Sequence, residues 1–121
     1  MNPETKIEKD ACDLIYKHLG VLSSKLKVLG QTGFPDRIFW LPDGKPLLIE
    51  FKCPGEEPEP KQRHIHAQLR ALGYMVEVHD NDLDALQAVI NILVELTPHW
   101  HKKKIQVLVV AQEYINKMRK L

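Results

Sequence analysis

Three charged side chains flank a short apolar hairpin and could together serve metal-assisted chemistry. Asp36 precedes the first apolar segment, whereas Glu50 and Lys52 end the second. Pairing of the two segments would bring these ends together in space, although more than a dozen residues separate them. Carboxylates and a backbone carbonyl are oxygen ligands that suit Mg²⁺ or Mn²⁺. Strand alternation puts Glu50 and Lys52 on one face, where the lysine could orient an attacking water.

The same residues also allow a purely structural interpretation. Lys52 could form an edge salt bridge with Glu50 or Asp36, and exposed ion pairs of this kind are common and contribute little stability. Two carboxylates beside one ammonium are costly to bury unless they are paired or bind a cation. The spacing by itself leaves both interpretations open.

The hairpin lies in a chain whose apolar periodicity switches between helix and strand. The predicted elements are a helix over 5–19, a strand over 25–29, hairpin strands over 38–41 and 47–51, a helix over 61–72, a strand over 74–79 and a helix over 83–96. A Pro-Asp-Gly turn at 42–44 joins the hairpin strands. The order α-β-β-β-α-β-α, followed by a C-terminal element, predicts an α/β fold with a mixed β-sheet flanked by helices.

Composition excludes several classes of protein. The chain has 121 residues, 44% of them hydrophobic and 27% charged, as expected for one globular domain. No segment has the roughly 20 apolar residues of a membrane helix, and the N-terminus lacks a secretory pattern. Cys12 and Cys53 form neither a disulfide framework nor a zinc motif. We therefore expect a cytoplasmic protein and exclude secreted, fibrous and membrane classes.

The net charge of +1 conceals an asymmetry between two parts of the chain. Residues 97–121 hold six basic residues and one acidic residue, so residues 1–96 carry a net charge of −4. We divide the chain accordingly into a core over 1–96 and a basic C-terminal extension over 97–121. Apolar spacing favours a helix in the extension, although a β-branched run over 105–110 would also suit a strand. We expect this helix to pack on the core or on a dimer partner.

A basic cluster in the extension is a candidate for DNA contact. It comprises Lys102, Lys103 and Lys104, which follow His99-Trp-His101. The lysines would contact phosphates, and the tryptophan could stack on a base. An ordinary solvated helix start is the alternative interpretation.

Other histidines and cysteines are weaker candidates for chemistry. His64 and His66 lie two residues apart on a predicted helix, so they point to different faces and do not readily share a metal. Neither Cys12 nor Cys53 has a histidine nearby in sequence, which disfavours a nucleophilic cysteine.

Four ordered motifs resemble a known nuclease family. Gly33-Phe-Pro-Asp36 comes first, Ile49-Glu-Phe-Lys52 and Cys53-Pro-Gly55 follow, and Lys61-Gln62 begins the next helix. This order is similar to that of the VRR-NUC nuclease domain, a branch of the PD-(D/E)XK restriction-endonuclease-like superfamily. The resemblance runs from about residue 5 to residue 79, and the restriction-endonuclease-like fold is the one that it implies.

The resemblance implies roles for individual residues of the hairpin and of the second helix. Asp36 and Glu50 would be metal-binding carboxylates, and the backbone carbonyl of Phe51 would be a further ligand for Mg²⁺ or Mn²⁺. Lys52 would position the nucleophilic water. Gln62 matches the family's helix glutamine near the active site, whereas without the resemblance it would pass for a plain surface residue.

Glu8 has two competing interpretations. It matches an acidic residue of the family's first helix that approaches the metal, and Glu4 lies nearby in the sequence. Thr5-x-x-Glu8 is also a capping-box pattern, which would give Glu8 a structural role alone.

The family also implies a substrate and an assembly. Free-standing members, many encoded by phages, are similar to Holliday-junction resolvases and act as homodimers in bacterial or phage-infected cells. We therefore expect a metal-dependent endonuclease that hydrolyses phosphodiester bonds in branched or junction DNA. A non-cleaving DNA-binding or scaffold module and a restriction-type endonuclease are the alternatives.

Overall fold

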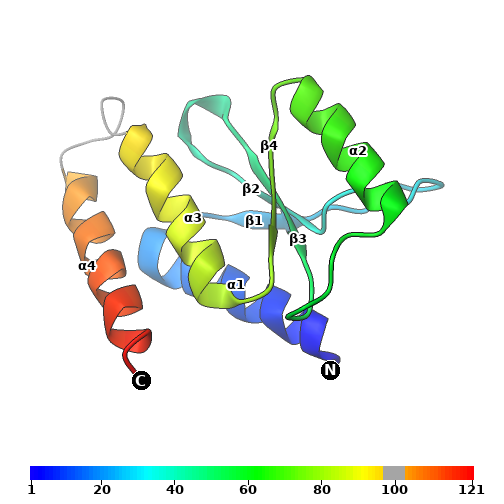
Figure 1. The fold of residues 1–121 in the computed structure, drawn as a ribbon. Coiled ribbons are helices and arrows are strands. Elements are labelled where there is room, and N and C mark those ends of the chain that lie inside the picture. Colours follow the sequence, from blue (N-terminus) through cyan, green and yellow to red (C-terminus); the bar gives the residue numbers. More distant parts are fainter. Residues whose placement is uncertain (97–102) are drawn as a thin grey trace.

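The computed structural model describes residues 1–96 and 103–121 and shows a mixed sheet flanked by helices (Figure 1). Its elements are α1 (Pro3–Leu19), β1 (Ser23–Lys25), β2 (Arg37–Phe39), β3 (Leu47–Phe51), α2 (Pro60–Ala71), β4 (Met75–His79), α3 (Asp82–Glu95) and α4 (Lys103–Met118). A short 3₁₀ turn, Pro42–Gly44, joins β2 to β3. The predicted α/β order is confirmed.

The sheet has the order β1-β2-β3-β4. The pairs β1–β2 and β2–β3 are antiparallel, whereas β3 and β4 are parallel and are joined through α2. This crossover helix is what a parallel connection requires. Because β3 pairs on both edges, its C-terminal end lies between elements that are distant in the sequence.

The two faces of β3 meet different helices. Leu47, Ile49 and Phe51 point into the main core with α1 and α3. By alternation, Leu48 and Glu50 point to the opposite face, on the side of α2. All five residues of β3 are buried, as expected for a strand covered on both faces. One face therefore builds the core and the other carries the charged residues of the hairpin.

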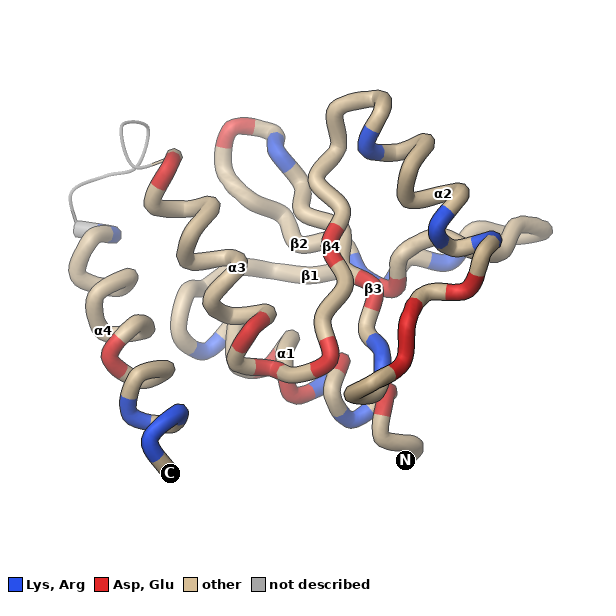
Figure 2. Tube along the Cα trace, viewed as in Figure 1, with Lys and Arg blue, Asp and Glu red and all other residues tan. Residues whose placement is uncertain are grey.

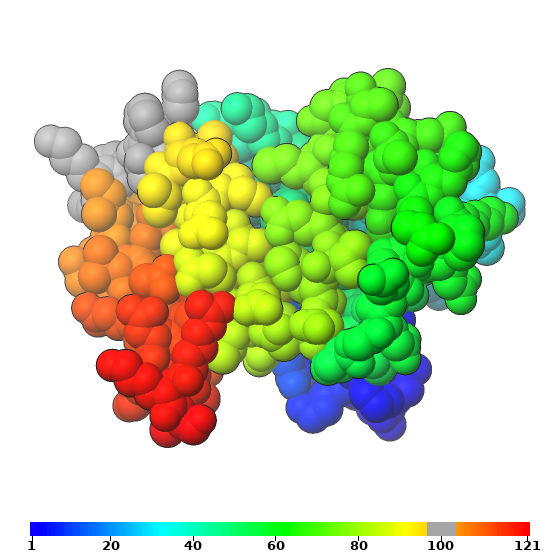
Figure 3. Space-filling view, in the orientation of Figure 1, coloured from blue at the N-terminus to red at the C-terminus, as the bar shows by residue number. Residues whose placement is uncertain are grey.

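Helix α4 packs against α1 and α3 through an apolar stripe. Leu108, Ala111 and Ile115 are buried in the same core cluster as residues of these two helices. Figure 3 shows α4 lying directly along α3. The apolar residues Ile105 and Val109 fall outside this stripe and are 50% and 43% exposed.

Some element boundaries differ from those expected. The N-cap of α1 is Asn2, whose Oδ1 accepts the Thr5 backbone N–H at 2.7 Å, so the predicted capping box of Thr5 and Glu8 is wrong. The strand expected over 25–29 is wrong except at Lys25: β1 spans Ser23–Lys25, because these are the residues that pair with β2. The helix expected over 61–72 spans Pro60–Ala71, and Leu72, its C-cap, is 75% exposed.

Candidate active site

Asp36 and Glu50 lie opposite each other at one end of the hairpin. Arg37 pairs with Ile49, so the same register extended by one residue sets Asp36 against Glu50. The Asp36 backbone N–H donates to the Ile49 carbonyl at 3.0 Å, and Asp36 Oδ2 accepts the Phe51 backbone N–H at 2.8 Å. The structure therefore brings the two predicted carboxylates together, held by the backbone of β3.

A third carboxylate joins this pair from the first turn of α1. Glu4, Asp36 and Glu50 each offer one oxygen, and these oxygens lie within 4.8 Å of one another. Oxygens bound to one divalent cation at about 2.0–2.6 Å have separations of this size. We call this set the carboxylate triad.

Glu8, one helical turn after Glu4, has a different environment. Its carboxylate accepts hydrogen bonds from Lys25 Nζ at 2.9 and 3.0 Å and from Arg37 Nε at 2.6 Å. Alternation along β2 puts Arg37 on the face of α1 and Asp36 on the opposite face. Two cations thus already balance the buried Glu8, and the structure does not bring it into the carboxylate triad. Sequence spacing alone could not show which of Glu4 and Glu8 lies beside Asp36 and Glu50, because residues four apart share a helix face.

Two side chains contact one oxygen of Glu50. Gln62 Nε2 donates to Glu50 Oε2 at 3.1 Å, and Lys52 Nζ lies 3.8 Å from the same oxygen. Glu50 is 1% exposed and Lys52 is 8% exposed, so their pairing is not the exposed edge salt bridge considered from the sequence. Gln62 Oε1 also accepts the Glu59 backbone N–H at 2.8 Å, which fixes the amide at the start of α2. Gln62 is therefore not a plain surface residue.

The electrostatics of the carboxylate triad favour a bound cation. Burial raises the pKa of Glu50 to about 8, and the nearby charge of Asp36 acts in the same direction. Burial also raises the pKa of Asp36, against the hydrogen bond from the Phe51 N–H, and it raises the pKa of Glu4. Glu50 Oε1 is buried without a hydrogen-bond partner. Such carboxyls ionise readily when a cation shares the site, so these residues fit a divalent metal.

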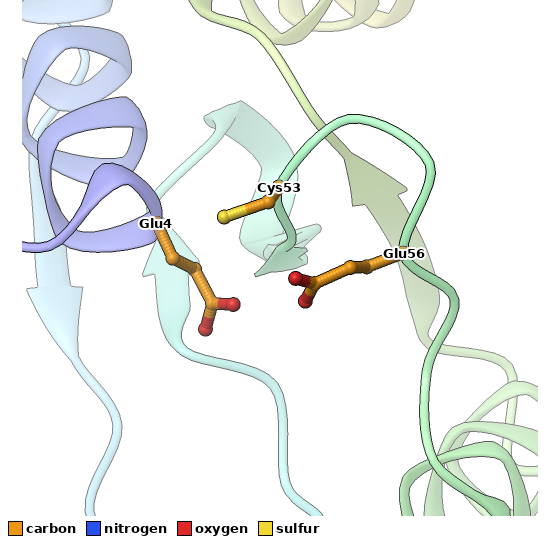
Figure 4. A group of neighbouring side chains, drawn as sticks. All are labelled: Glu4, Cys53 and Glu56. Atoms are coloured by element: carbon orange, nitrogen blue, oxygen red, sulfur yellow. The ribbon is translucent and has the colours of Figure 1, made fainter.

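Glu4 also belongs to a second group of side chains. Figure 4 shows it facing Cys53 and Glu56, which lie on the loop after β3, and one ligand atom of each lies within 4.8 Å of the others. This group includes a thiol, which is a softer ligand than Mg²⁺ or Mn²⁺ prefers. The carboxylate triad, with oxygens alone, is the better match for these ions.

Further acidic residues lie on the loop that follows Lys52. Figure 2 shows them along the loop between β3 and α2, where Glu56, Glu57 and Glu59 are exposed. A polyanion approaching this loop would be repelled unless a cation offset the negative potential.

Comparisons with known proteins place the chain in a family. No family model matches the sequence. The chain is 40% identical over 89 residues to a protein named "Putative nuclease p44" from Acyrthosiphon pisum secondary endosymbiont phage 1, with 73% of this chain and 95% of that protein aligned. A solved structure described as a VRR_NUC domain superposes with a TM-score of 0.64 at 26% identity, covering 84% of this chain and all of that one. The chain belongs to the VRR-NUC nuclease family.

Membership in the VRR-NUC family assigns the restriction-endonuclease-like fold. Asp36 lies directly before β2, Glu50 lies in β3 and Lys52 directly follows β3. Gln62 lies in the first turn of α2. From the sequence, Glu4 was only a neighbour of Glu8 and His66 was disfavoured as a metal ligand, whereas the structure places both beside Glu50. The signal available for each was its four-residue spacing from a recognised position, Glu8 or Gln62.

The predicted basic cluster of this VRR-NUC chain is described only in part. Lys102 and residues 99–101 lie outside the described residues, as does the side chain of Lys103. Lys104 is exposed in the first turn of α4, and Figure 1 shows this turn on the opposite side of the molecule from the end of β3. Contact of these lysines with DNA phosphates therefore stays a prediction.

Within the described residues, none of the helices is both long and apolar enough to span a membrane.

Proposed function

We propose that this chain is a divalent-metal-dependent endonuclease that hydrolyses phosphodiester bonds in DNA. The observation that carries the proposal is the carboxylate triad beside Lys52 at the end of β3. The similarity to a phage protein named as a nuclease and to a VRR_NUC domain supports the same activity. A non-cleaving scaffold would have no need of three crowded carboxylates with raised pKa values, so the enzyme is favoured over that alternative.

Each residue has a defined task in this proposal. Glu4, Asp36 and Glu50 would hold Mg²⁺ or Mn²⁺, and the Phe51 carbonyl would supply a further oxygen. When bound, the cation would neutralise charge developing on the scissile phosphate and lower the pKa of a water. Lys52, buried beside Glu50, would orient the attacking water.

Gln62 would keep the Glu50 carboxylate in position through its hydrogen bond to Oε2. Because a metal ligand must hold its orientation during the reaction, such outer partners contribute to metal affinity as well as to rate. Gln62 can do so because its own amide oxygen is tied to the backbone of Glu59.

We further propose branched DNA, with the Holliday junction as the model substrate, and a homodimer as the active form. The resemblance to free-standing VRR-NUC nucleases supports both. A two-fold dimer would present two carboxylate triads to two strands of a junction. Bacterial or phage-infected cytoplasm would be the compartment. A restriction-type endonuclease would instead cut linear duplex at a defined sequence.

A cleavage assay tests this function directly. Four-way junction, flap and linear duplex DNA are incubated with the protein in Mg²⁺, Mn²⁺, Ca²⁺ or excess chelator, with Asp36→Asn as the inactive control. We expect cleavage in Mg²⁺ or Mn²⁺ with preference for the junction, and none in chelator. Activity that persists in chelator contradicts the metal requirement, and preference for linear duplex contradicts the junction substrate. The mass in solution tests the dimer.

A further inference from the structure

His66 lies over Glu50, one helical turn after Gln62. Residues four apart share a helix face, so both side chains project from α2 toward the same carboxylate. His66 is 1% exposed, and its Nε2 lies 4.0 Å from Glu50 Oε1. Gln62 donates to the other oxygen, Oε2. The two side chains therefore lie against different oxygens of one buried carboxylate.

Glu50 Oε1 is a hydrogen-bond acceptor and the facing His66 Nε2 can carry a donor hydrogen, yet the two atoms are not hydrogen-bonded. Glu50 Oε1 and His66 Nε2 are both buried without a hydrogen-bond partner. Leaving a buried polar atom unpaired costs about 1–3 kcal/mol. Their separation of 4.0 Å exceeds an ordinary N–H···O distance by only about 1 Å. A small rotation of the Glu50 carboxylate or of the imidazole would let Nε2–H donate to Oε1.

His66 is placed beside the carboxylate triad, not within it. Among the described residues, Glu50 groups with Glu4 and Asp36 as possible metal ligands, and His66 is not part of that group. Mg²⁺ also prefers oxygen ligands to imidazole. His66 therefore lies where it can contact Glu50, a candidate metal ligand, without itself binding the metal.

We propose that His66 is a positioning residue for metal binding. Its Nε2–H donates to Glu50 Oε1 when a cation occupies the carboxylate triad, so that His66 and Gln62 hold one oxygen each. Glu50 then keeps the orientation in which it binds the cation. This inference rests on the proposed metal-dependent function, since a chain that binds no divalent cation has no such step.

Calorimetric titration with Mn²⁺ tests the proposal on the intact protein and its variants. His66→Leu removes the donor while retaining bulk, and His66→Gln retains an N–H donor. His64→Leu makes the same change at an exposed position of the same helix. We expect His66→Leu to weaken Mn²⁺ binding about 10-fold or more, His66→Gln to restore most of the affinity, and His64→Leu to bind as wild type does.

A kinetic measurement separates positioning from loss of shape. His66→Leu should lower kcat at limiting Mn²⁺ while the KM for junction DNA changes little, because His66 acts on Glu50 and not on DNA. Wild-type Mn²⁺ affinity in folded His66→Leu overturns the inference. Equal losses in His66→Leu and His66→Gln also overturn it, because shape alone would then explain them. If the wild-type protein itself binds no Mn²⁺, the proposed function fails instead.

If His66→Leu does not fold, the wild-type protein still provides a test. The assigned imidazole ¹H–¹⁵N signals of His66 are recorded with and without Mg²⁺. The proposal predicts a protonated Nε2 whose signal shifts and becomes protected from exchange when Mg²⁺ binds. An Nε2 signal that Mg²⁺ leaves unchanged overturns the proposal.

Discussion

Glu50 is the most deeply buried carboxylate of the triad, and its surroundings determine how it behaves without metal. Asp36 lies opposite it across the hairpin, and like charges at such positions repel. Lys52 offsets this only in part, since its Nζ is 3.8 Å away. The folded protein therefore favours a protonated Glu50 until a cation replaces the proton.

This protonation predicts a pH-dependent stability in the absence of metal. The folded-state pKa of Glu50, about 8, lies above the ordinary value of 4.5, so the folded protein binds more protons than the unfolded chain between these values. The free energy of unfolding should fall as pH rises through this window. The free energy of unfolding of Glu50→Gln should not fall in this window. At pH 9 it should exceed that of the wild-type protein by more than about 1.4 kcal/mol, the equivalent of one pKa unit. Urea unfolding in chelator from pH 4 to 9 measures this free energy for both proteins. The same pH dependence in wild type and Glu50→Gln would contradict the prediction.

Glu4 and Glu8 lie one helical turn apart and have different proposed roles, Glu4 as a metal ligand and Glu8 as a structural ion-pair partner. Glu4→Gln should lower Mn²⁺ affinity at least about 10-fold and leave stability nearly unchanged, since it removes a ligand. Glu8→Gln should cost about 1–3 kcal/mol, because Lys25 and Arg37 lose their buried partner. Its Mn²⁺ affinity should stay near that of wild type. Calorimetry and urea unfolding on both variants check this, and the reverse pattern would assign the metal to Glu8.

At the scale of elements, the loop before β2 packs directly on the start of α2. Gly33 has a positive φ of 96°, and a Cβ there would lie 3.1 Å from both the Lys61 carbonyl oxygen and Ile65 Cγ1. This close approach sets the segment that leads to Asp36 against the turn that carries Gln62. Glycine is therefore needed at position 33 for space as well as for backbone conformation.

Gly33→Ala should impair the site more than a matched change elsewhere. Gly55 also has positive φ, but a Cβ there would meet nothing within 4 Å. Both alanines add about 1–2 kcal/mol of backbone strain, and only Gly33→Ala must also shift the loop away from α2. We expect a lower kcat and weaker Mn²⁺ binding for Gly33→Ala than for Gly55→Ala. Equal effects would show that the contact with α2 does not position Asp36.

Some elements could be predicted closely because local signals agreed. The run 47–51 matched β3 since a turn precedes it and a proline-rich loop follows it. Helix α3 begins at Asp82, one residue before the expected start at 83, because Asn81 is its N-cap and its Oδ1 accepts the Asp84 N–H at 2.8 Å. The start of α1 was misplaced because Asn2 and Thr5 are both good caps.

Glu4 and His66 could not be assigned, because helix periodicity gives a face and not the distance to a partner strand.

At the scale of the whole molecule, α4 joins the same core that supports the site. Besides its apolar stripe, Gln112 exchanges hydrogen bonds with Gln87 of α3, and Arg119 pairs with Asp84 at 2.7 Å. This end of α4 is tied to the start of α3, directly after β4. The C-terminal extension therefore packs against α1 and α3 and stabilises their position against the sheet.

Truncation of the α4 stripe should therefore destabilise the whole fold. Ile115 is fully buried, and Ile115→Ala should cost about 2–5 kcal/mol from lost burial and the cavity left behind. Val109→Ala, on the exposed side of the same helix, should change stability by about 0.5 kcal/mol or less. Urea unfolding monitored by circular dichroism measures both. A negligible loss in Ile115→Ala would mean that α4 is dispensable for the core.

In the proposed function, Glu4, Asp36 and Glu50 together hold the cation that supports cleavage. Anomalous diffraction from crystals of the intact protein grown with Mn²⁺ locates that ion most directly. We expect a Mn²⁺ peak within coordination distance of all three carboxylates, and no peak there in Glu50→Gln crystals. A Mn²⁺ peak at Glu4, Cys53 and Glu56, or at Glu8, in protein that cleaves DNA would contradict the claim.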